Sequence, residues 1–214
     1  MPEGHHRKKP RLRGLSHTLA LLVLLPAAAL LVWRARHGPV PAGAAIYAAS
    51  VVLMFATSSI YHRFHWRQPL RALLGRIDHA AIFLLISGSF TPFGLRIGGL
   101  LGYGSLLGLW LGALIGIYLV VRLQGVGKKA RAAIYVGLGW AMVPLAPALL
   151  QLVGWRGIGL LVAGGVFYTA GAVVYALRRP DPLPRTFGFH EIFHLLVIAA
   201  AACHFWAVAE LASL

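Results

Sequence analysis

The sequence predicts an all-α integral membrane protein, a bundle of seven transmembrane helices. Of its 214 residues, 59% are hydrophobic and only 12% are charged, whereas about a quarter of the residues in a soluble domain are charged. Apolar runs of about 20 residues recur along the whole chain, and this length crosses the hydrocarbon core of a bilayer. A soluble fold of this size would need one core, built from helices that are apolar on one face only.

The seven predicted spans follow one another with short loops. They are expected at residues 15–33, 41–61, 79–95, 100–121, 132–153, 157–177 and 190–211. The first has a basic leader, as a signal peptide would, but no small-residue cleavage site follows residues 27–29, so it is interpreted as a retained span. The chain thus divides into a basic tail, residues 1–14, and one seven-helix membrane domain, residues 15–214.

Basic residues are concentrated in alternate loops, which predicts the orientation. Sixteen of the twenty Lys and Arg residues lie in the N-terminal tail and in the second, fourth and sixth loops. Cytoplasmic loops carry such an excess, so the N-terminus is predicted to be cytoplasmic and, after seven spans, the C-terminus outside. The net charge is +15, and the basic residues that produce it lie between the apolar runs. The expected binding partner of these residues is therefore the anionic cytoplasmic leaflet of the cell membrane and not nucleic acid.

The fourth span carries a regular glycine pattern at Gly104, Gly108, Gly112 and Gly116. Small residues four apart lie along one stripe of a helix and allow close approach of a neighbouring backbone. We interpret this stripe as a packing interface and not as a ligand site.

Three histidines are expected at the cytoplasmic end of the bundle. Ionisable residues at membrane depth are costly and usually functional. His190 and His194 open the last span four residues apart, hence on one helix face, and His62 ends the second span at the same depth. Three neutral imidazoles with one open position form the usual catalytic zinc site. The alternative is that these are interfacial histidines wetted by lipid headgroups.

Two further polar residues are candidates for the same site. Ser58 lies one turn deeper than His62 on the same face, where it could orient a metal ligand. Asp78 opens the third span, also at the cytoplasmic end. It could balance the metal charge, hold a metal-bound water or act as general base. The alternative for Asp78 is a helix N-cap.

Other residues are given smaller roles. Glu191 completes the H-E-x-x-H pattern in which Glu is the base of a zinc protease. It follows His190 directly, so it is turned by about 100° from the histidine face, and the base role is not favoured. His204 is about 15 Å deeper than His194, at 1.5 Å per residue, and is not expected to share the metal. His79 is expected at the membrane interface, and His17 is a candidate for a polar contact near the site.

Taken in their order along the chain, the polar residues described above and the segments around them resemble the hemolysin III family of the progestin and adiponectin receptor (PAQR) superfamily. The resemblance covers roughly residues 15–212 and is carried by residues 58–62, 77–83, 88–92, 164–171 and 187–194, with His204 and Phe205 beyond. It implies a seven-helix fold with zinc near the cytoplasmic surface, held by His62, His190 and His194, and with Asp78 holding a water. Residues 13–17, Arg-Gly-Leu-Ser-His, depart from the family pattern, in which Glu and Asn precede the Thr-His pair.

The function expected from the residues and the resemblance together is a zinc-dependent hydrolase of a lipid amide or ester, linked to membrane lipid homeostasis. Adiponectin receptors and alkaline ceramidases look like enzymes of this kind. A second hypothesis is a receptor or sensor in which the zinc is structural. A third is a lytic protein, as the name hemolysin suggests, although none of the spans shows the polar stripe of a pore.

Overall fold

The structure, a computed structural model, describes residues 10, 12–122 and 127–213. Most of the predicted basic tail, including Arg7, Lys8, Lys9 and Arg11, lies outside the described residues. The described chain is helical almost throughout. Its helices are α1 (Leu15–Ala35), α2 (Pro41–Arg63), α3 (Leu70–Ile97), α4 (Gly99–Arg122), α5 (Lys128–Trp140), the short 3₁₀ helix η1 (Val143–Leu145), α6 (Ala146–Leu177) and α7 (Phe189–Ser213).

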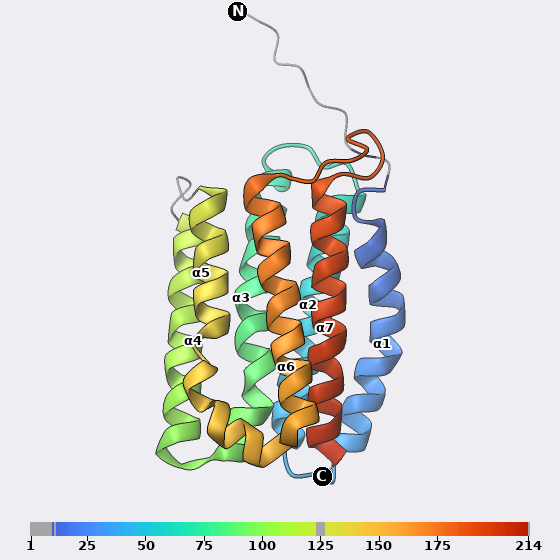
Figure 1. The fold of residues 1–214 in the computed structure, drawn as a ribbon. Coiled ribbons are helices and arrows are strands. Elements are labelled where there is room, and N and C mark those ends of the chain that lie inside the picture. Colours follow the sequence, from blue (N-terminus) through green and yellow to red (C-terminus); the bar gives the residue numbers. More distant parts are fainter. Residues whose placement is uncertain (1–9, 11, 123–126, 214) are drawn as a thin grey trace, which may run out of the picture.

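The predicted fold class, an all-helical membrane protein, is confirmed. Six helical segments of the described chain are long and apolar enough to cross a membrane, and one of them is the 50-residue stretch Lys128–Leu177. Figure 1 shows that this stretch descends the bundle as α5 and returns as α6, next to α7. The count of seven crossings and the placement of the two ends relative to the membrane stay predictions.

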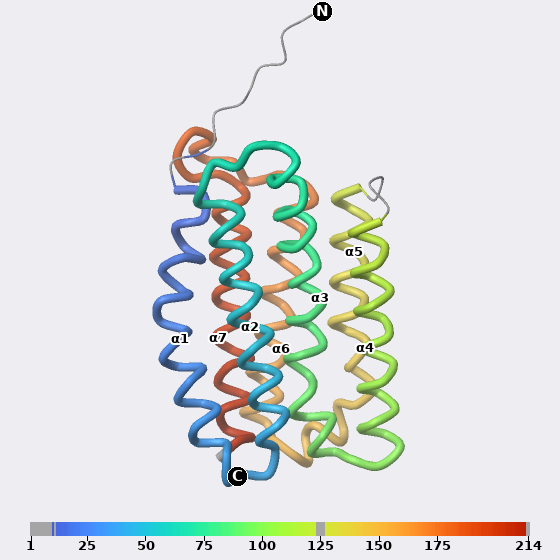
Figure 2. Tube along the Cα trace, turned by 180° about the vertical axis from the view of Figure 1, so that it is seen from behind, coloured from blue at the N-terminus to red at the C-terminus, as the bar shows by residue number. Residues whose placement is uncertain are grey.

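The helices form a closed bundle. α1 packs between α2 and α7, α3 joins α2 to α4, and α5 and α6 complete the circle back to α7. Figure 2 shows the same arrangement from behind, with α4 and α5 on the far side from α1. The ends of α2, α4 and α6, near which most of the predicted cytoplasmic Lys and Arg residues lie in the sequence, are at the end of the bundle where α1 begins (Figure 1). We call this end, where α1, α3, α5 and α7 start and α2, α4 and α6 stop, the basic end.

Apolar side chains cover the outside of the bundle and polar ones lie within it. Val23 is 73% exposed and Leu100 is 92% exposed, which suits contact with lipid rather than water. The polar and charged residues that are buried include four histidines, an aspartate and a glutamate, listed here: His17, His62, His190, His194, Asp78 and Glu191. Burying ionisable groups is costly, so the clustering of these residues indicates a functional site.

The third helix begins at Leu70 and not at residue 79, which corrects the prediction for Asp78. Asp78 lies well inside α3, so the N-cap alternative is wrong. Residues 70–77 carry Leu70, Leu73, Leu74 and Ile77 at helical spacing, with Arg71 and Arg76 between them. The arginines lowered the apparent hydropathy of this segment, but the amphipathic pattern is a good helix former.

The predicted fifth span, residues 132–153, is also wrong as a single helix. Regular helix stops at Trp140, and residues 146–153 already belong to α6. Pro144 lies in the first turn of η1 and Pro147 in the first turn of α6, because proline is tolerated in the first turn of a helix but not in its interior. Gly154 adds a break inside α6, with a φ of 63°, in the left-handed region that favours glycine.

The glycine stripe of α4 is a packing interface over only half of its length. A Cβ on Gly116 would meet the Phe83 ring of α3, and one on Gly112 would lie 2.8 Å from Leu138 of α5. Gly104 and Gly108 are exposed and meet no other helix. Each step of four residues turns the stripe by about 40° around the helix, so the whole stripe winds away from its neighbours.

Candidate metal centre

The first turn of α7 is fixed by carboxylates, and this sets the direction of its histidines. Glu191 accepts the backbone N–H of Gly188 at 2.8 Å, and Asp181 accepts that of Phe189 at 3.1 Å. Both contacts satisfy amides that a helix start leaves without partners. His190 and His194 follow on one face of the capped turn and lie against the end of α2.

Three histidines come together at this point. The Nε2 atoms of His62 and His190 are 3.3 Å apart, and one ring nitrogen from each of His62, His190 and His194 lies within 4.8 Å of the others. Their exposed fractions are 8%, 8% and 1%. Nitrogen atoms this close and this buried, from helices far apart in the sequence, form a group that could hold a metal ion.

Asp78 reaches the cluster from a third helix. Its Oδ2 lies 3.6 Å from the Nε2 of His62 and 3.7 Å from the Nδ1 of His79. His79 itself is half-buried in the bundle. Its Nδ1 lies 2.6 Å from the carbonyl of Gly75 and its Nε2 lies 3.5 Å from the Tyr175 hydroxyl. Asp78 therefore lies between a histidine of the cluster and a second histidine that other groups hold in place.

His17 of α1 completes the surroundings of His194. The two rings stack with centroids 3.7 Å apart and an interplanar angle of 10°. The Nδ1 of His17 lies 2.8 Å from the Ser58 hydroxyl, so the described partner of Ser58 is a histidine of α1. The Nε2 of His17 is buried and has no hydrogen-bond partner among the described residues. A buried polar atom of this kind calls for a partner from a ligand or water.

Gly14 allows α1 to start directly against the end of α2. Its φ is 79°, and a Cβ there would lie 2.8 Å from the Cβ of His62. Any side chain would be both strained and too close. This contact brings Arg13 and His17 to the site.

Both carboxylate oxygens of Glu191 make contacts that hold helix starts in place. Its Oε1 accepts the Nε–H of Arg13 at 2.6 Å, while its Oε2 caps Gly188. The side chain of Glu191 is 4% exposed and that of Arg13 is 20% exposed. With both oxygens engaged, Glu191 ties the start of α1 to the start of α7. That another residue acts as the base stays a prediction.

Removing Arg13 is expected to destabilise the bundle. Arg13→Gln leaves the Glu191 carboxylate buried without its cation, and breaking such a pair costs about 3 kcal/mol. The double variant Arg13→Gln, Glu191→Gln should recover much of this loss, because two neutral amides can still share a hydrogen bond. Thermal unfolding in detergent of the wild type, both single variants and the double variant measures the coupling. Purely additive losses would contradict a coupled pair.

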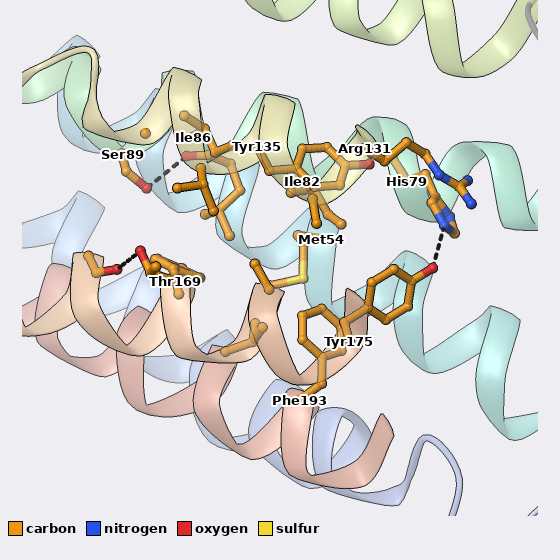
Figure 3. Close-up of a pocket in the computed structure, with 18 of the residues that line it drawn as sticks. Met54, His79, Ile82, Ile86, Ser89, Arg131, Tyr135, Thr169, Tyr175 and Phe193 are labelled. Atoms are coloured by element: carbon orange, nitrogen blue, oxygen red, sulfur yellow. Dashed lines mark hydrogen bonds between the residues drawn. The ribbon is translucent and has the colours of Figure 1, made fainter. Parts of the chain in front are cut away.

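A cavity of about 710 Å³ continues from the histidines into the bundle. Figure 3 shows its polar end, where His79, Arg131 and the hydroxyl of Tyr175 gather, and the apolar side chains Met54, Ile82, Ile86 and Phe193 beyond them. Cavities of roughly 300–1,000 Å³ with mainly apolar walls and a few polar groups are typical ligand sites. The candidate metal centre thus opens onto a space shaped for an amphipathic molecule.

Comparison with known proteins places the chain in a family. The sequence model of the family described as haemolysin-III related matches residues 5–205. The chain belongs to this family. Hemolysin-3 of Bacillus cereus is 31% identical over 199 residues, which cover 91% of this chain and 88% of that protein. The adiponectin receptor protein of Drosophila melanogaster is 33% identical over 158 residues, covering 65% of this chain and 35% of the receptor. The monocyte to macrophage differentiation factor of Homo sapiens is 27% identical over 170 residues, 76% of this chain and 67% of that protein.

The predicted membership of the hemolysin III family and the PAQR superfamily is therefore confirmed. With its apolar helices, this hemolysin III family protein is a multi-pass protein of the cell membrane. The buried cluster of His62, His190 and His194 agrees with the predicted ligand set to the extent that it could hold a metal ion. The roles of Asp78 and Ser58 stay predictions, and His204 lies outside the cluster.

In this hemolysin III family protein, the sequence did not predict two residues of the site: Arg13, which pairs with Glu191, and His79, which lines the cavity. Arg13 was visible only as part of a basic run and as a departure from the family pattern. His79 was hidden because the start of α3 was placed too late, which put it at the end of a helix. If the helical pattern had been followed back to Leu70, His79 would have been placed well inside the helix, next to Asp78.

Proposed function

We propose that this protein is a zinc-dependent hydrolase that cleaves an amide or ester bond of a membrane lipid. One observation carries the proposal. Three buried histidines and the Asp78 carboxylate stand together at the end of a largely apolar cavity of about 710 Å³. Groups suited to activate water and space suited to an acyl chain are thus combined in one site.

The histidine set fits zinc. Zinc binds imidazole nitrogen at about 2.0–2.1 Å in tetrahedral geometry, so two of its ligand atoms are about 3.3 Å apart. The Nε2 atoms of His62 and His190 are 3.3 Å apart. Three neutral imidazoles and one free position are the composition of a catalytic zinc site, whereas structural sites use four protein ligands.

The chemistry divides among the residues of the site. When bound, zinc would lower the pKa of a water molecule to about 7 and polarise the scissile carbonyl. Asp78, with its Oδ2 3.6 Å from His62, would accept the proton of the attacking water. His17, oriented by Ser58, holds the ring plane of His194 by stacking and presents its unpartnered Nε2 to a polar atom of the bound molecule.

The apolar part of the cavity supplies the specificity for lipid. Ile82 and Ile86 line it from α3, Met54 from α2 and Phe193 from α7 (Figure 3). Burying an acyl chain there gains about 0.8 kcal/mol per CH₂ relative to water, but much less relative to the bilayer, because the lipid is already in an apolar medium. The cavity therefore positions the chain, and the head group beside the histidines decides which bond is cleaved.

The test is fatty acid release by the purified, zinc-loaded protein. The lipid panel includes ceramides, N-acyl amino acids and lysophospholipids, and mass spectrometry measures the products. We expect release from at least one class, its loss on chelation, and its return with zinc but not with magnesium. A protein that holds zinc at about one ion per chain and releases no fatty acid from any lipid would contradict the hydrolase and support the receptor or sensor with structural zinc.

A further inference from the structure

Four cationic side chains border the same cavity. Arg13 precedes α1, Arg76 belongs to α3, and Lys128 and Arg131 belong to the first turn of α5. Each of them is half-buried. Among the described residues that line the cavity, Asp78 is the single carboxylate. The cavity therefore carries an excess of positive charge at its polar end, before any metal ion is counted.

Three of these cations have no carboxylate partner within the described chain. Arg13 is paired with Glu191, whereas Arg76, Lys128 and Arg131 appear in no ion pair of the described residues. The Nε of Arg131 is buried and has no hydrogen-bond partner there either. Half-buried cations without counter-charges are unfavourable, so the site is suited to receive a negative charge from outside the protein.

Two of the unpaired cations, Lys128 and Arg131, lie near Tyr175. Figure 3 shows Arg131 beside His79 at the polar end of the cavity, with Tyr175 opposite. The ammonium of Lys128 lies 5.2 Å from the ring centre of Tyr175, within cation–π range. Tyr175 in turn reaches the Nε2 of His79 at 3.5 Å, next to Asp78. An anion bound between Lys128 and Arg131 would thus adjoin the candidate metal centre.

We propose that the cavity selects an anionic amphiphile, with a phosphate or carboxylate head held by Lys128 and Arg131 and an acyl or alkyl chain in the apolar part. The inference rests on the proposed function, since the same cavity would hold the lipid to be cleaved, and it names the substrate class as negatively charged. Charge-assisted hydrogen bonds from Arg and Lys to phosphate or carboxylate oxygens are stronger than hydrogen bonds between neutral groups. Because these side chains are half-buried, dissolved salt screens their charges less than it screens charges on the surface.

A pair of adjacent lysines provides a matched control. Lys128 borders the cavity, whereas Lys129 is exposed and does not. Attraction of an anion to the basic surface as a whole would depend on both lysines equally. Binding inside the cavity depends on Lys128 alone.

The experiment measures binding of two probes to the full-length protein in a non-ionic detergent by titration calorimetry. Dodecyl phosphate and dodecylphosphocholine have the same chain, but only the first has a net negative charge. We expect dodecyl phosphate to bind about tenfold more tightly, which corresponds to about 1.4 kcal/mol. Lys128→Gln and Arg131→Gln should remove most of this preference. Lys129→Gln should leave it unchanged, and Arg131→Lys, which keeps the charge, should retain much of it.

Three results would overturn the inference. They are equal affinity for the two probes, equal loss in Lys128→Gln and Lys129→Gln, and binding of inorganic phosphate as tight as that of dodecyl phosphate, which would indicate a phosphate site without a chain. Dodecyl phosphate has neither an amide nor a carboxylic ester, so its binding is read without turnover. Selective binding without lipid hydrolysis contradicts only the proposed function, and hydrolysis without charge selectivity contradicts only this inference.

Discussion

The double variant His190→Ala, His194→Ala is expected to lose both zinc and lipid hydrolysis. Two of three ligands disappear, and His62 alone cannot hold the ion at ordinary concentrations. The wild type should contain about one zinc per chain, and the variant close to none, with fatty acid release at the background level. Metal analysis by mass spectrometry and the release assay measure the two effects on the same preparation.

His65→Ala is the matched control for that variant. His65 is exposed and follows α2 at the same end of the bundle, so its loss should change neither zinc content nor turnover. Elution of all variants as a single detergent-solubilised species shows whether the bundle is retained. Full zinc content in the double variant would contradict the assignment of His190 and His194 as ligands.

Asp78→Asn is expected to lower hydrolysis by about 10²-fold or more, the scale of general base catalysis. Asparagine keeps the size and hydrogen-bonding capacity of the side chain but cannot accept the proton of water. The three histidines are unchanged, so zinc should remain bound. A loss in kcat with retained zinc would separate a role in the reaction from a role in holding the metal.

Glu191→Gln serves as the comparison because the H-E-x-x-H pattern offers Glu191 as an alternative base. Both of its oxygens are occupied, by Arg13 and by the Gly188 amide, so we expect a loss of stability and little loss of turnover. Abolished turnover in Glu191→Gln with an unchanged Asp78→Asn would reverse the two roles and favour an intramembrane protease. Unchanged turnover in both, with weakened zinc binding, would favour the structural zinc of a receptor or sensor.

Composition and periodicity alone determined the fold class. Twenty-residue apolar runs have few alternatives to membrane helices, since lipid offers no partner for an open backbone. The segregation of Lys and Arg then put His62, His190 and His194 at one level, and the structure brings their ring nitrogens within 4.8 Å. The spacing of His190 and His194 sufficed for their shared face, because an α-helix repeats every 3.6 residues.

Helix boundaries near charges and prolines could not be predicted as well. Arg71 and Arg76 hid the first two turns of α3, and with them the inner positions of Asp78 and His79. Pro144 and Pro147 divided the predicted fifth span. In both cases the prediction averaged hydropathy over a window, whereas the backbone responds to single residues. An arginine near a helix end is tolerated because its side chain reaches water. A proline inside a helix removes a backbone hydrogen bond and interrupts the helix.

Only the tertiary structure decided which polar groups are partners. The sequence placed Ser58 beside His62, yet its hydroxyl lies 2.8 Å from His17 of another helix. Arg13 and Glu191 are 178 positions apart and meet at 2.6 Å. The helical period determines which face a residue occupies, but the rotation and offset of one helix against another depend on packing details such as Gly14 against His62. For that reason the metal ligands could be proposed from the sequence, while the groups that orient them and the cationic lining of the cavity required the assembled bundle.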